Sequence, residues 1–165
     1  RAMTDRLLVG VLGNRDAGKS HTWNTLFGRT VRRGKSPHHL ELRPGECVEA
    51  FLVSGSFEER GEYAGDILSD QDCRIVLCSM QYTKEVHQSL DYLIDNGFFL
   101  YIHWLNPGYS DPGETWDRLG LVSQILSVPS ALCIRDGKKD AGARVQEMRE
   151  FIYGWAKYRD LIFDC

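Results

Sequence analysis

The chain has 165 residues, 42% of them hydrophobic, which is enough for one domain with a full core and too few for a second. No apolar run approaches the roughly 18–20 residues that a membrane span needs, and no signal-peptide pattern opens the sequence, so we expect a cytoplasmic protein without a membrane partner. A net charge of −3 does not favour a dedicated nucleic-acid surface, although it leaves nucleic acid open as a partner.

Charge is unevenly distributed along this single domain of residues 1–165. Residues 1–43 carry nine lysines and arginines against three acids, whereas the remainder carries eleven against twenty. A local positive excess of this kind favours an anionic ligand at the N-terminal end. Arg1 and Ala2 read as a remnant in front of a native start at Met3, or as the edge of a trimmed longer chain.

Five cysteines are scattered along the sequence with no C-x-x-C pair: Cys47, Cys73, Cys78, Cys133 and Cys165. Their odd number and wide spacing argue against a zinc site and against a disulfide framework. We therefore expect reduced, buried thiols, as in a cytosolic protein.

The most specific pattern lies near the start of the chain. An apolar run at residues 7–12 predicts a strand buried on both faces of a parallel sheet, and helical spacing after Lys19 predicts a helix that Gly28 closes. Between them lies G-x-x-x-x-G-K-[ST], the Walker A motif of a phosphate loop. The residues predicted to bind a nucleotide are Gly13, Asn14, Arg15, Asp16, Ala17, Gly18, Lys19, Ser20 and His21.

The chemistry of this motif follows from its residue types. Two glycines let the backbone curl so that successive amides surround a phosphate beside the positive end of a helix. Lys19 reaches the β- and γ-phosphate oxygens as a catalytic residue, and the Ser20 hydroxyl takes one Mg²⁺ position. The alternative is a glycine-rich turn that only joins strand to helix.

A basic loop at residues 29–39 follows and shows no apolar periodicity. Its cations are candidates for phosphate contacts, an arginine finger or an acidic protein partner, and the alternative is a solvated loop; they are Arg29, Arg32, Arg33 and Lys35. Residues 39–42 and 47–53 then predict an antiparallel hairpin joined by a Pro-Gly turn.

The remaining elements alternate between helix and strand. Helices are predicted from the capping box at Ser56 to about Leu68, over residues 83–96, from an N-cap at Asp111 to about residue 126, and as a long closing helix. Buried strands are predicted at residues 74–79, 98–105 and 131–134. This order predicts an α/β fold: a three-layer α/β/α sandwich of the P-loop NTPase type, with a mainly parallel sheet of about five or six strands and one antiparallel strand.

Ligands of such sheets lie at the carboxyl ends of the strands, which directs attention to residues 54–59, 79–82, 106–111 and 135–140. Asn106 and Tyr109 could face a nucleotide or a second substrate there, or could simply form a stiff turn.

Residues 13–28, GNRDAGKSHTWNTLFG, resemble the first signature of the Era-like and related translation-factor-class GTPases. Asn24 and Gly28 fit the places of an Asn and a closing Gly in that signature, and the basic loop with its hairpin resembles switch I and the second strand. The resemblance implies that Thr30 or Ser36 supplies the switch I hydroxyl that completes Mg²⁺ coordination.

Two signatures of that family are missing. No Asp-x-x-Gly follows the second hairpin strand. Glu58 and Glu59 are the nearest acids, with Glu58 a candidate catalytic residue and helix capping the alternative role of both. At the next strand end Gln81 is a candidate for positioning a water, or is an ordinary strand-end polar residue. In place of Asn-Lys-x-Asp the chain has a partial match to that motif, in which the candidates for contacts to the base are Arg135, Lys138 and Asp140. ATP and GTP therefore both stay open, with a slight preference for ATP.

Three functions are consistent with these residues. The first is a protein that binds ATP or GTP with Mg²⁺ and hydrolyses it slowly, because no clear water-positioning acid exists. The second is a small P-loop kinase that phosphorylates an unidentified acceptor. The third is a degenerate nucleotide-binding module that recruits a partner, with the basic loop of residues 29–39 as the candidate contact.

Overall fold

The computed structural model describes residues 5–31, 37–56, 58, 64–68 and 72–165. Within these residues, seven strands form one mixed sheet built around β1, Arg6–Gly13. Strand β1 pairs in parallel with β4, Ile75–Gln81, on one side and with β5, Phe98–Leu105, on the other. Because Leu7, Leu8 and Val9 are all fully buried, β1 is covered on both faces, as its apolar sequence requires.

The sheet extends outward from this centre in both directions. Strand β3, Glu46–Ser56, lies parallel to β4, and β6, Ser130–Arg135, lies parallel to β5. The hairpin strand β2, His38–Arg43, runs antiparallel to β3, so that the order is β2-β3-β4-β1-β5-β6. A short β7, Phe163–Asp164, pairs antiparallel with β3.

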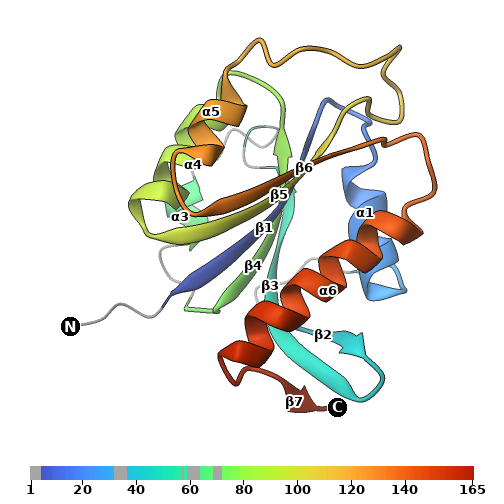
Figure 1. Cartoon of the computed structure of the whole chain (residues 1–165), viewed down its shortest axis with the longest axis vertical. Coiled ribbons are helices and arrows are strands. Elements are labelled where there is room, and N and C mark those ends of the chain that lie inside the picture. The colour runs from blue at the N-terminus through green and yellow to red at the C-terminus, as the bar shows by residue number, and fades with distance from the viewer. Residues whose placement is uncertain (1–4, 32–36, 57, 59–63, 69–71) are drawn as a thin grey trace.

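Helices cover both faces of the sheet (Figure 1). Helices α1, Lys19–Phe27, and α6, Gly142–Tyr158, lie on one face. Helices α3, Ala64–Leu68, α4, Val86–Asp95, and α5, Leu121–Leu126, lie on the other. Each face has its own apolar cluster, so the predicted three-layer α/β/α sandwich is confirmed. The sheet differs in having seven strands, of which β2 and β7 are antiparallel, since a two-residue strand leaves no periodicity to detect.

The helix predicted from Asp111 to residue 126 is wrong over its first half, because regular helix begins only at Leu121. Asp111 Oδ2 accepts from the upstream amide of Gly108 at 2.8 Å rather than capping downstream amides. The Asn106 amide group also bonds both backbone groups of Thr115, at 2.8 and 2.9 Å, which removes them from helical bonding. Asp117 caps α5 instead, since its carboxylate accepts from Val122 N at 2.8 Å.

The predicted capping box joins Ser56 to Glu59, which lies outside the described residues. Ser56 is the last residue of β3 and pairs with Ser79 of β4 in the parallel ladder. Of the helix predicted to run as far as Leu68, the described residues show helix at Glu58 and in the short α3.

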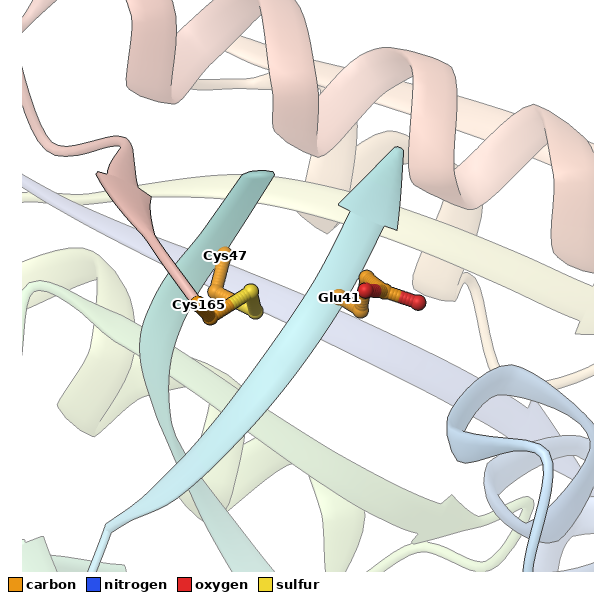
Figure 2. A group of neighbouring side chains, drawn as sticks. All are labelled: Glu41, Cys47 and Cys165. Carbon is orange, nitrogen blue, oxygen red and sulfur yellow. A yellow bond between two sulfur atoms is a disulfide. The ribbon is translucent and has the colours of Figure 1, made fainter. Parts of the chain in front are cut away.

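The expectation that all five cysteines are reduced is wrong for two of them. Cys47 of β3 and Cys165 form a disulfide across 118 residues, with their Cα atoms 5.9 Å apart (Figure 2). Cys73, Cys78 and Cys133 are free thiols. The disulfide joins the C-terminal strand to the hairpin, and Glu41 of β2 lies beside it, opposite Cys47 in the ladder. A cytoplasmic location stays a prediction. Among the described helices, none combines the length and apolarity that crossing a membrane requires.

Reduction of the Cys47–Cys165 disulfide should lower the free energy of unfolding by about 2–4 kcal/mol, because the bond constrains a long loop of the unfolded chain. Urea unfolding with and without dithiothreitol measures this, with Cys165→Ser expected to match the reduced wild type. Cys133→Ser keeps the bond and should respond to reductant as the wild type does. If the free energy of unfolding of the wild type is the same with and without dithiothreitol, the Cys47–Cys165 disulfide is wrongly assigned.

Candidate functional site

A cavity of about 850 Å³ opens at the carboxyl ends of the parallel strands, a volume that suits a small-molecule ligand. Four groups of residues line it: residues 15–21 from the end of β1 and the start of α1, Ser56 and Ser79 from β3 and β4, Tyr109 and Ser110 after β5, and residues 137–140 with Arg144 between β6 and α6. The strand-end rule therefore locates this cavity correctly.

The loop after β1 has the backbone curl that its motif predicts. Asp16 and Gly18 both have positive φ, 59° and 104°, and Gly18 precedes the first residue of α1. A side chain on Gly13 would place its Cβ 2.8 Å from that of Ala17, which explains a glycine at the first position. Ser20 and His21 follow in the first turn of α1, exposed at the cavity.

The Lys19 side chain folds back against the loop that follows β1. It is 7% exposed, and its Nζ donates to the carbonyls of Gly13 at 3.2 Å and Asn14 at 2.8 Å. These contacts keep a buried ammonium group at the cavity wall beside the N-terminus of α1. An anion bound there would meet both the ammonium and the positive end of the helix.

The loop after β5 braces the phosphate loop from one side. Backbone amides of Tyr109 and Ser110 donate to the carbonyls of Ala17 at 3.0 Å and Asp16 at 3.3 Å. The Asp111 carboxylate accepts from Asn14 Nδ2 at 3.1 Å as well as from Gly108 N. Asp111 thus has a positioning role that its reading as a helix cap missed.

Two glycines make this brace possible. A Cβ on Gly108 would lie 2.6 Å from Ala17 Cβ, and one on Gly137 would lie 2.8 Å from Ala17 O. The amide of Gly137 also donates to Pro107 O at 2.7 Å, which ties the β5 and β6 loops together. A glycine two or three residues after the end of a strand is the sequence signal that could have indicated this close approach.

Arg144 of α6 lines the cavity, and its individual role was not predicted. It is 5% exposed, with Nη2 donating to Thr22 Oγ1 at 3.1 Å and Nη1 donating to Lys139 O at 3.3 Å, whereas Nε is buried without a partner. Burial lowers the pKa of Arg144, although a guanidinium stays protonated at any physiological pH. A buried arginine on an amphipathic helix leaves no distinctive pattern in the sequence.

On the other side of the loop, Glu58 bonds the end of β4 rather than lining the cavity. Its carboxylate accepts from the Gln81 backbone amide and from Ser89 Oγ, each at 2.7 Å. Burial raises the pKa of Glu58, and the nearby charge of Lys19 partly opposes that rise. Gln81 is likewise absent from the lining, where Ser56 and Ser79 are the residues from these strands.

The candidate base contacts divide into two groups. Lys138 and Asp140 line the cavity, but Lys138 Nζ donates to Tyr109 O at 3.0 Å and Asp140 Oδ2 accepts from Gly142 N at 3.0 Å. Arg135 lies outside the lining, in a bidentate ion pair with Glu147 that raises the pKa of Arg135.

The described candidates of the loop after α1, Arg29 and Thr30, do not line the cavity. Thr30 and Arg29 are exposed and absent from its lining, with the Arg29 guanidinium 5.8 Å from the centre of the Phe27 ring. Arg32, Arg33, Lys35 and Ser36 lie outside the described residues.

Positive charge dominates the cavity. The cationic side chains of its lining are Arg15, Lys19, Lys138, Lys139 and Arg144, whereas its carboxylates, among the described residues, are Asp16 and Asp140. Opposite charges in a partly enclosed cavity attract an anionic ligand and raise its local concentration.

These features define a P-loop-like α/β fold. The structure is similar to that of a de novo designed "PLOOP2X3_50 fold protein" solved by NMR, with a TM-score of 0.56 over 91% of this chain and 96% of that chain. At 12% sequence identity the likeness shows the fold alone. No protein-family model matches the sequence, and no curated protein does.

Gly108→Ala should destabilise the domain by about 1–3 kcal/mol, because the added methyl group collides with Ala17 across the phosphate loop. Thermal unfolding followed by circular dichroism measures the effect. Gly113→Ala is the matched control, since a Cβ there has no neighbour within 4 Å. Equal melting temperatures for the two variants would show that the close packing is not tight.

Proposed function

We propose that the protein binds a nucleoside triphosphate, ATP or GTP, in this cavity and hydrolyses it slowly in the presence of Mg²⁺. The observation that carries the proposal is the Walker A loop, curled at the end of β1 and facing a cavity in which cations outnumber acids. The resemblance of residues 13–28 to Era-like GTPases supports the same class of ligand.

Each part of the loop has a role in this proposal. Backbone amides at the start of α1 bind the β-phosphate, and Lys19 exchanges its carbonyl contacts for phosphate oxygens. Mg²⁺ fits as a companion of the bound phosphates, since the exposed Ser20 hydroxyl offers one ligand and phosphate oxygens and water offer the others. The ion supplies neutralisation of phosphate charge.

We expect slow hydrolysis because of the carboxylates found near the phosphate loop. Among the described residues, the carboxylates that line the cavity are Asp16 and Asp140, and neither comes from β3 or β4. Glu58 is absent from the lining, and its carboxylate oxygens accept from Gln81 N and Ser89 Oγ, which gives it a structural role at the end of β4. The same observation favours the second candidate function, a module that binds nucleotide without hydrolysing it. A kinase activity stays a prediction.

Lys19→Ala should weaken binding of Mg²⁺·ATP or Mg²⁺·GTP by at least about 10-fold, because charged hydrogen bonds to phosphate contribute roughly 1.5–3 kcal/mol. Isothermal titration with both triphosphates and their diphosphates measures this, with and without Mg²⁺. Lys157→Ala, an exposed lysine in the last turn of α6, is the control.

The proposal fails if no nucleotide binds the wild type better than Lys19→Ala. Phosphate release then separates the two candidate functions. Release above the Lys19→Ala level supports hydrolysis, and release equal to that level excludes hydrolysis and leaves the binding module.

A further inference from the structure

The Tyr109 ring is unusual in being a large aromatic group left open to solvent at a ligand cavity. It is 66% exposed, although the residue lines the cavity. Its backbone is fixed on both sides, because its amide donates to Ala17 O at 3.0 Å and its carbonyl accepts from Lys138 Nζ at 3.0 Å. These bonds fix the Tyr109 backbone directly beside the phosphate loop, and the exposed ring projects from that fixed backbone.

Three polar side chains on this side of the cavity help to hold the loops together. Lys138 is bonded to Tyr109 itself, one oxygen of Asp140 accepts from Gly142 N, and Arg144 bonds Thr22 and the carbonyl of Lys139. Reading a base edge needs donors and acceptors that are directed at the ligand, and these bonds direct part of that capacity toward the protein.

The two sides of the phosphate loop differ in what they offer a ligand. Among the described residues, the lining toward β3 and β4 is Ser56 and Ser79, which are 0% and 3% exposed. Toward β5 and β6 the lining includes Tyr109 and long side chains. Tyr109 is therefore the large aromatic residue that the described lining offers on the β5 side, and a nucleobase is the flat apolar part of a nucleotide.

We propose that the Tyr109 ring is the platform on which the nucleobase of the bound triphosphate stacks, and that this contact serves adenine and guanine about equally. The inference rests on the proposed function, since it needs a nucleotide in the cavity. Stacking tolerates any base because every base has a π face, and it contributes roughly 1–3 kcal/mol per base. It also accounts for a nucleotide site in a chain without an Asn-Lys-x-Asp motif.

Comparing ligands with and without a base tests the platform directly. Isothermal titration would use ATP, GTP and inorganic tripolyphosphate, each with Mg²⁺, on the wild type, Tyr109→Ala and Tyr109→Phe. Tyr109→Ala should lose about 5- to 150-fold in affinity for ATP and GTP alike and retain its affinity for tripolyphosphate. Tyr109→Phe should bind all three as the wild type does. Tyr158→Ala, which removes an 88%-exposed tyrosine at the far end of α6, is the control.

Three outcomes would overturn the platform. They are an unchanged affinity of Tyr109→Ala for both nucleotides, an equal loss for tripolyphosphate, and a loss confined to one of the two bases. If tripolyphosphate binds the wild type but not Lys19→Ala, the proposed phosphate site is supported, whatever the result for the Tyr109 variants. If no ligand binds the wild type, both proposals fall.

Discussion

The arrangement of the site depends on the close packing around Ala17. Its methyl group and backbone lie where side chains on Gly13, Gly108 or Gly137 would have to go, within 2.6–2.8 Å. The three loops that follow β1, β5 and β6 therefore approach each other so closely that no side chain fits between their backbones at these glycines. Hydrogen bonds from the Tyr109 and Ser110 amides then hold the phosphate loop curled before any ligand arrives. Such preorganisation reduces the conformational entropy that a ligand must offset on binding.

The electrostatics of the cavity follow from this packing. Loops brought together around Ala17 carry Arg15, Lys138 and Lys139, and α6 adds the buried Arg144. The result is a positive cavity at the positive end of α1, suited to a polyanion. Among the described residues, the β3 and β4 side contributes serines to the lining, and Glu58, which is not in the lining, ties strand β4 to α4 through Gln81 and Ser89. Binding is therefore better supported than catalysis.

The sequence predicted the elements whose signals are local and missed the features that depend on contacts distant in sequence. The bounds of α1 matched because helical spacing and the following Gly28 mark it, and those of β5 matched because a continuous apolar run marks it. Asp111 was misread because its partners, Gly108 N and Asn14, meet it only in the folded chain. The Cys47–Cys165 pairing spans 118 residues, and Arg144 reaches the cavity through helix packing. No local pattern encodes either.

The central claim is that residues 13–20 form a preformed site for phosphate, which an amide NMR titration tests most directly. Adding Mg²⁺·ATP to ¹⁵N-labelled protein should shift the amide resonances of residues 16–21 first and most, because those amides face the bound phosphates. Resonances of β7 and the C-terminal end of α6, at the opposite end of the sheet, should stay in place. Unchanged phosphate-loop resonances at millimolar nucleotide, or shifts confined to other surfaces, would contradict the account.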